Sequence, residues 1–123
     1  MTDSAIDVGT FKAKSSVDGS TIQVVCSGEG DSSTLSALEA LLEAVHGKAV
    51  DAKAAAVVVD LRQVSFMNSS CFTKLIGWVT RVRGMEEAAR YQIRLRSNQE
   101  ILWQRRSLQA LKCFAVDLIT IES

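Results

Sequence analysis

The sequence contains no proline, a single histidine and three cysteines, and its charges cancel. Without proline there are no stiff linkers, which argues against several domains joined by rigid spacers. Fourteen basic and fourteen acidic residues leave no net field to attract nucleic acid or an anionic membrane. No apolar run approaches the roughly 20 residues that span a bilayer. Residues 1–4 show no signal-peptide pattern. We therefore expect one cytoplasmic domain.

The three cysteines, Cys26, Cys71 and Cys113, are far apart and show no metal-ligand or redox-pair spacing. Reduced thiols in a cytoplasmic protein are the simplest interpretation. Cys71 falls in the first turn of a predicted helix, where the dipole lowers the pKa of a thiol. A nucleophilic or redox role and a packing role both stay open for it. We interpret Cys26 and Cys113 as structural residues in apolar surroundings.

Hydrophobic periodicity predicts an α/β domain over residues 9–123, preceded by a flexible segment 1–8. The predicted strands and helices alternate in the order β-β-α-β-α-β-α-β, which indicates a mixed, mainly parallel five-stranded sheet with about three right-handed crossover helices. The expected strands cover residues 10–14, 21–26, 54–61, 91–96 and 116–121. The first helix runs from Leu35 to a stop at Gly47, the second ends at Gly84, and Ser97 or Asn98 caps the third.

The segment from Val57 to Cys71 is the most informative part of the chain. It is expected to form a buried strand, then a short apolar turn (Val64, Phe66 and Met67), then two hydroxyls at the start of a helix. A serine placed there lies beside free backbone N–H groups and the positive end of a helix dipole. That position suits a phosphate. Ser69 and Ser70 fit helix capping equally well.

Other catalytic patterns are absent from the sequence. Neither serine has the flanking glycines of a nucleophile elbow, and the only histidine, His46, is expected on the surface near the end of the first helix. The segment Gly28-Glu29-Gly30-Asp31 lacks the P-loop lysine and the full dinucleotide fingerprint. Glu29, Asp31 and Asp60 form no recognisable metal cluster. Trp78 and Trp103 are expected either to pack at the core edge or to contact a partner. We expect no cofactor and no metal.

The central segment resembles the signature of STAS domains (sulfate-transporter and anti-sigma-factor-antagonist domains). Antagonist members have an apolar strand ending in Asp-Leu, an apolar turn, and Asp-Ser-Ser-Gly opening a helix. The matching residues here are Asp60-Leu61, then 64–67, then Asn68-Ser69-Ser70-Cys71. The resemblance extends over residues 9–121 in element order, and it implies a single STAS-like domain that acts as a regulatory switch rather than an enzyme.

Within this family the first serine of the pair is phosphorylated by a kinase of the anti-sigma type and dephosphorylated by a cognate phosphatase. The position matching this serine is Ser69. The unmodified form binds its partner, often that same kinase, and phosphorylation releases it. A downstream regulator or a second copy of the chain is a further partner implied. We expect the partner surface to comprise Glu29, Gly30, Asp31, Phe66, Met67, Asn68, Ser70, Cys71 and Lys74.

The chain departs from the family pattern in three ways. Asn68 replaces aspartate, which keeps the helix cap but removes a carboxylate beside the acceptor hydroxyl. Cys71 replaces glycine, which adds bulk to the partner surface. The sequence also ends shortly after its last predicted strand, so we expect an exposed helix face or sheet edge that a partner or second copy covers. The alternative to a phosphorylated switch is an unmodified scaffold subunit of a signalling complex.

Overall fold

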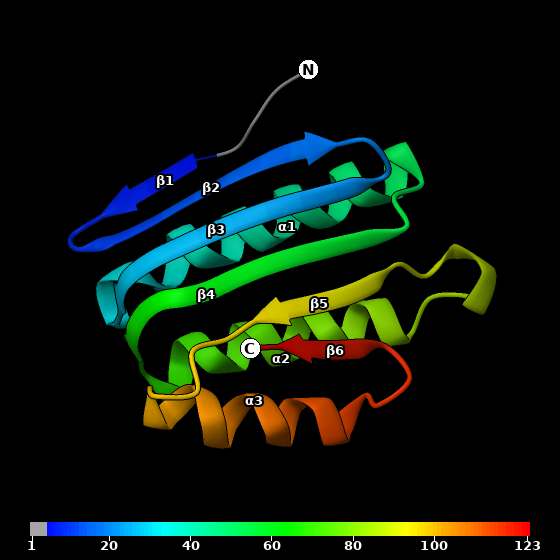
Figure 1. Cartoon of the computed structure of the whole chain (residues 1–123). Helices are drawn as coiled ribbons and strands as arrows, with labels where there is room; N and C mark the ends of the chain where they lie inside the picture. The colour runs from blue at the N-terminus through cyan, green and yellow to red at the C-terminus, as the bar shows by residue number, and fades with distance from the viewer. Residues whose placement is uncertain (1–4) are drawn as a thin grey trace.

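The computed structural model describes residues 5–123, and these form a single six-stranded sheet with three α-helices (Figure 1). The strands follow one another across the sheet in chain order. Their bounds are β1 Ala5–Val8, β2 Phe11–Asp18, β3 Thr21–Gly30, β4 Ala56–Met67, β5 Gln92–Arg96 and β6 Ile119–Glu122. The helices are α1 Leu35–Ala52, α2 Ser69–Arg83 and α3 Leu102–Phe114, with short 3₁₀ turns η1 Ser32–Thr34 and η2 Glu87–Ala89.

The sheet is mixed, as the sequence predicted, but it has six strands rather than five. Strands β1, β2 and β3 are antiparallel neighbours, while β3 to β6 are all parallel. The additional strand is β1, which lies inside the segment expected to be flexible. Its four residues pair with β2 through the turn at Gly9, and residues 1–4 lie outside the described residues. Residues 5–8 therefore form an edge strand of the sheet.

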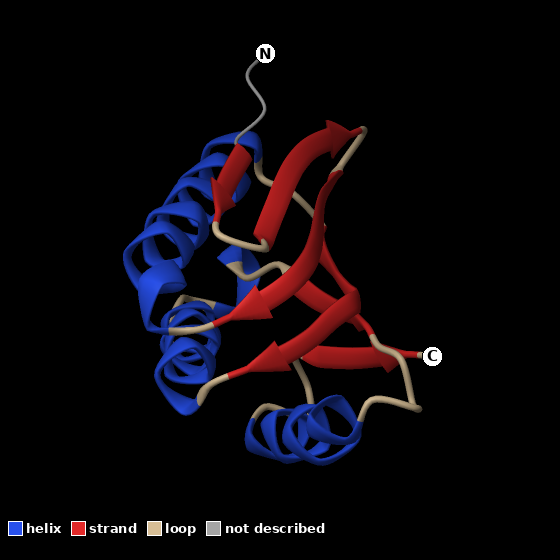
Figure 2. Ribbon diagram, turned by 90° about the vertical axis from the view of Figure 1, so that its left-hand side faces the viewer, coloured by secondary structure: helices blue, strands red, loops and turns tan. Residues whose placement is uncertain are grey.

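The helices and the sheet enclose one apolar core. Helices α1 and α2 lie behind the sheet in Figure 1, and the view turned by 90° shows them stacked along one side of it, with α3 beside β6 (Figure 2). Val57 and Val59 of β4 share this core with Leu38 and Leu108 from two of the helices. The continuous apolar run of β4 is thus buried at the centre of the sheet, as such runs predict.

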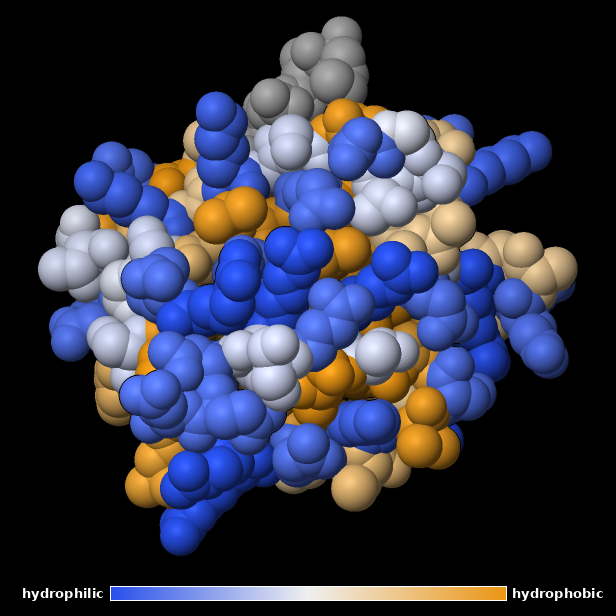
Figure 3. All heavy atoms as spheres, in the orientation of Figure 1, coloured by the Kyte–Doolittle hydropathy of each residue, from blue (hydrophilic) through white to orange (hydrophobic). Residues whose placement is uncertain are grey.

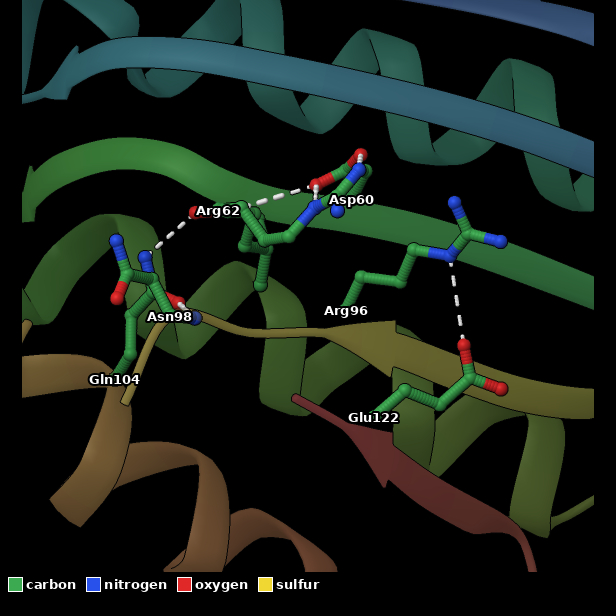
Figure 4. A network of polar contacts seen from close by, with 7 residues as sticks. Asp60, Arg62, Arg96, Asn98, Gln104 and Glu122 are labelled. Carbon is green, nitrogen blue, oxygen red and sulfur yellow. Dashed lines mark hydrogen bonds and ion pairs between the residues drawn. The ribbon is translucent and has the colours of Figure 1, made fainter. Parts of the chain in front are cut away.

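The other face of the sheet is largely hydrophilic (Figure 3). Strand register places Lys14, Val25, Asp60, Arg96 and Glu122 in one row across it. Neighbouring charges on this face pair with one another (Figure 4): Arg62 lies 2.7 Å from Asp60, and Arg96 lies 3.4 Å from Glu122. These ion pairs help to make the uncovered face of the sheet hydrophilic.

Strand β3 is longer than predicted and continues through the expected glycine loop to Gly30. Its register with β4 shifts between Val25 and Ser27 and again between Gly28 and Glu29. At the second irregularity Gly28 has a φ of +94°, and a Cβ there would lie 1.9 Å from the Thr10 carbonyl oxygen. Glycine is required by this close approach of two backbones, not by a nucleotide.

Two predicted helix boundaries are wrong. Helix α1 passes through Gly47 and ends at Ala52, because Lys53 adopts the left-handed conformation that closes it (φ 52°). Neither Ser97 nor Asn98 caps α3, whose preceding residue is Ile101. Asn98 instead accepts a hydrogen bond from the Glu100 N–H and so stabilises the turn before the helix.

His46 lies inside the protein instead of on the surface, on the face of α1 that also buries Leu42 and Ala49. Its Nδ1 lies 2.7 Å from the Tyr91 hydroxyl, to which the Trp78 Nε1–H donates a hydrogen bond of 2.8 Å. All three side chains are buried, so Trp78 packs in the core. Cys26 is buried as expected, whereas Cys113, also expected in apolar surroundings, is exposed.

Candidate functional site

The predicted site lies at the carboxyl end of the parallel strands, where the end of β4, the start of α2 and the loop after β3 meet. The Asn68 N–H donates to the Gly30 carbonyl oxygen at 2.9 Å. The Cys71 thiol donates to the Asp31 carbonyl oxygen at 3.2 Å. These two contacts tie the 29–31 loop to the helix start, although the segments are about 40 residues apart. The structure therefore brings together the two edges of the predicted partner surface.

Asn68, and neither serine, caps α2. Its side-chain oxygen accepts a hydrogen bond of 2.9 Å from the Cys71 N–H. Ser69 and Ser70 are the first two residues of the helix, and both are exposed. The interpretation of these serines as caps is therefore wrong. Asn68 does the capping that a serine or aspartate can also do, which leaves both hydroxyls without that structural role.

The Ser69 hydroxyl is accessible and makes no hydrogen bond within residues 5–123. The N–H groups of Ser69 and Ser70 likewise have no acceptor there, since Asn68 occupies only the N–H of Cys71. Such unpaired N–H groups and the helix dipole create a positive potential at the N-terminus. The surroundings of Ser69 thus favour an added anion at the helix start.

The surface around Ser69 is less apolar than the sequence suggested. The expected apolar turn is the last part of β4, in which Leu61, Val64 and Met67 are buried at intervals of three residues. Phe66 alone of the predicted apolar trio is exposed, at 47% of its surface. Val64 and Met67 belong to the core. A partner would meet one aromatic ring here, not a continuous apolar surface.

Three residues of the predicted partner surface are buried beneath it: Gly30, Met67 and Cys71. A Cβ on Gly30 would lie 3.6 Å from the Met67 side chain and 3.7 Å from the Cys71 sulfur. These residues form a layer that supports the exposed loop and helix start from below. They position the surface and do not face a partner.

The Cys71 thiol lacks the properties of a nucleophile. The side chain is fully buried, and burial together with the Asp31 charge raises its pKa above the ordinary value of 9.0. The expected lowering by the helix dipole is therefore wrong, because desolvation disfavours the thiolate. Burial likewise raises the pKa of Cys26 to about 12. The interpretation of Cys71 as a packing residue is the one that the geometry supports.

The exposed part of the predicted surface consists of Glu29, Asp31, Phe66 and Ser70, with Asn68 and Lys74 half-buried. Hydrogen bonds from the side chain and backbone of Ser33 hold the pKa of Asp31 below its usual range, so Asp31 is a carboxylate at neutral pH. Lys74 is paired with Glu39 of α1 at 2.6 Å. A phosphate on Ser69, at the start of α2, would therefore stand next to a loop that carries the side chains of Asp31 and Glu29.

Two residues of α3 that the sequence did not single out for this role hold the end of β4 in place. The Gln104 side chain donates to the carbonyl oxygens of Leu61 and Val64, and the Trp103 indole also donates to Val64. Gln104 also accepts from the Asn98 N–H at 2.8 Å (Figure 4). Helix α3 thus replaces a neighbouring strand beyond the point where β5 ends. Nothing local to residues 103 and 104 indicates this, since their partners are about 40 residues away.

The described residues contain no second candidate site of the kinds considered below. Residues 5–123 contain no group of three or more His, Cys, Asp or Glu side chains placed to hold a metal. In this part of the chain, no helix combines the length and apolar character needed to span a membrane. His46 is the twelfth residue of α1, roughly 16 Å along the axis from its start, and it is paired with Tyr91. It is not placed to activate Ser69.

Comparison with solved structures identifies the fold. The chain superposes on an anti-sigma factor antagonist from Mycobacterium paratuberculosis with a TM-score of 0.64, covering 98% of this chain and 86% of that one at 18% sequence identity. No family model and no curated protein sequence matches the chain. The STAS-like fold expected from the central segment is thus confirmed over nearly the whole chain.

Proposed function

We propose that this protein is a phosphorylation-controlled regulator that binds a partner when Ser69 is unmodified and releases it when Ser69 carries a phosphate. The proposal rests on one observation, which is that capping and exposure fall to different residues at the start of α2. Asn68 caps the helix, so the neighbouring Ser69 hydroxyl is exposed without a structural task. The fold shared with an anti-sigma factor antagonist supports a regulator of this type.

The switch works through charge. A kinase transfers the terminal phosphoryl group of ATP to the Ser69 oxygen, which loses its proton, and ADP leaves. A phosphatase restores serine by hydrolysis and releases inorganic phosphate. The modification adds about −1.5 to −2 charges at neutral pH. A partner seated over Phe66 and Ser70 would have to desolvate that charge, which costs more free energy than the contact returns.

The free N–H groups at the helix start contribute to the modified state. They favour the phosphate by the helix-dipole effect, worth about 0.3–1 kcal/mol at an exposed position. Asn68, which replaces the carboxylate of the family pattern, introduces no like charge next to it. These two features partly offset the repulsion from Asp31 and Glu29 in the neighbouring loop, and release of the partner follows from the interface, not from unfolding.

Binding by substituted proteins tests the proposal. Ser69→Ala should retain the partner isolated with the wild-type protein from its native cells, and Ser69→Glu should lose most of it. Ser20→Glu adds the same charge at an exposed turn at the other end of the sheet and should bind like wild type. Equal retention by Ser69→Ala and Ser69→Glu would support the alternative, a constitutive scaffold subunit.

A further inference from the structure

A groove between α1 and α2 on the helical side of the molecule shares only Lys74 with the predicted partner surface. Its volume is about 290 Å³, and Leu42 and Trp78 line its floor. Gly77 stands in its wall in the middle of α2. The groove is open to solvent on the surface formed by the two helices.

Gly77 is not explained by the packing of its own chain. A Cβ at this position would meet nothing within 4 Å, and glycine inside a helix costs about 1 kcal/mol relative to alanine. On α1, the exposed positions Ala40, Ala44 and Gly47 are also small. Small side chains on both helices allow the backbone of another element to approach closely.

The charges of the groove are arranged by helix. Glu39 and Glu43 belong to α1, while Lys74 and Arg81 belong to α2. Each acid pairs with a base across the groove, Glu39 with Lys74 and Glu43 with Arg81. The helices run in the same direction, since both return from the carboxyl to the amino ends of parallel strands. The surface therefore has an acidic row beside a parallel basic row.

We infer that this surface binds a second copy of the chain, face to face, about a two-fold axis that runs along the groove. Such an axis places α1 of each copy over α2 of the other. The acidic row of each copy then faces the basic row of the other copy. Because the helices run in the same direction, Glu39 lies level with Lys74 of the second copy. An axis across the groove would put the two acidic rows together, and this arrangement is disfavoured by repulsion. The interface is isologous, as in most homodimers.

The inference does not rest on phosphorylation of Ser69, because the groove and its charges are independent of that hydroxyl. Dimerisation and partner release are therefore tested by separate measurements. A dimer formed by protein without a phosphate on Ser69 would support the dimer and would not contradict the proposed switch. A monomer whose partner binding still responds to phosphorylation would overturn the dimer alone.

Charge exchange provides the sharpest test, read as molar mass by sedimentation equilibrium over a series of protein concentrations. In the acidic variant, Lys74→Glu and Arg81→Glu make both rows negative; in the basic variant, Glu39→Lys and Glu43→Lys make both positive. The wild-type protein should dimerise, each variant alone should be monomeric, and an equimolar mixture should form a one-to-one dimer. Exposed ion pairs contribute little to folding, and circular dichroism verifies that both variants fold.

A second variant tests the groove itself. Gly77→Leu fills open space, so it should fold at least as stably as wild type and lose the dimer. Thr120→Leu, at an exposed position of β6 outside both helices, should still dimerise. A wild-type protein that stays monomeric, folded variants that stay monomeric when mixed, or a Gly77→Leu protein that dimerises like wild type would each overturn the inference.

Discussion

The side-chain oxygen of Asn68 lies 2.9 Å from the backbone nitrogen of Cys71, and this one contact defines where α2 begins. It removes the need for a serine cap and fixes Ser69 as the first residue of the helix. We predict that Asn68→Ala lowers the free energy of unfolding by about 1 kcal/mol, whereas Asn68→Asp leaves it nearly unchanged. Urea denaturation measures both. If Asn68→Ala unfolds at the wild-type midpoint, the capping assignment is incorrect.

Thiol reactivity should separate the three cysteines. Cys113 is exposed, while Cys26 and Cys71 are buried and their pKa values are raised. One thiol per native chain should react promptly with an aromatic disulfide reagent at neutral pH, and three should react after unfolding. The Cys113→Ser variant should show no prompt reaction. Rapid labelling of Cys71 in the native protein would reopen a thiol-dependent role for it.

Stability should fall on mild acidification because of His46. Burial, the larger cause, and the nearby Arg81 charge lower the pKa of this imidazole below its usual 6.5 in the folded state. The unfolded chain therefore takes up a proton first as the pH falls. The stabilisation is fully present above pH 6.5 and is lost as the pH falls from there through the lower folded pKa. Urea midpoints measured between neutral and weakly acidic pH should decline for wild type.

A His46→Gln variant should show a flatter dependence in that interval, because glutamine carries no titrating group. The depressed pKa values of Asp31, Glu43 and Asp60 act only at lower pH, near the range of free carboxyl groups. A wild-type slope that persists unchanged in His46→Gln would contradict the assignment to His46.

The anchoring of α3 to β4 should be visible in stability. Gln104 is buried and satisfies the Asn98 N–H and the carbonyl oxygens of Leu61 and Val64. Gln104→Met keeps the volume but leaves the Asn98 N–H and the Leu61 carbonyl oxygen unpaired, while Trp103 still donates to Val64. The free energy of unfolding should therefore fall by about 1–3 kcal/mol. The exposed Gln109 of the same helix supplies the control, since Gln109→Met should cost less than about 0.5 kcal/mol. Equal effects of the two substitutions would rule out the anchoring role.

The sequence predicted the elements whose signals are local. The valines of β4 and the hydroxyl-rich start of α2 carry their own patterns, and their place in a parallel sheet followed from the alternation of strands and helices. Strand β1 did not follow from its four residues, because it exists only by pairing with β2. His46 was misplaced for a related reason: its partner Tyr91 is 45 residues away.

The sequence predicted which two segments meet at the candidate site, but not which of their residues are buried. The irregular register of β3 with β4 changes the burial pattern at the end of β4, so Val64 and Met67 point inward although the sequence predicted them in an apolar turn. Alternation along a strand does not reveal such an irregularity. The separation of tasks between Asn68 and Ser69 also needed the structure, because any of three adjacent polar residues fits a helix cap.

The proposed switch requires that the Ser69 hydroxyl receives a phosphate in the cell. Mass spectrometry of peptides spanning residues 63–81, from protein isolated from its native cells in several growth states, decides this. We expect a phosphate on Ser69 and none on Ser70 or Thr73, with an occupancy that changes between states. Peptides that carry no phosphate on Ser69 in any growth state would contradict the proposed switch.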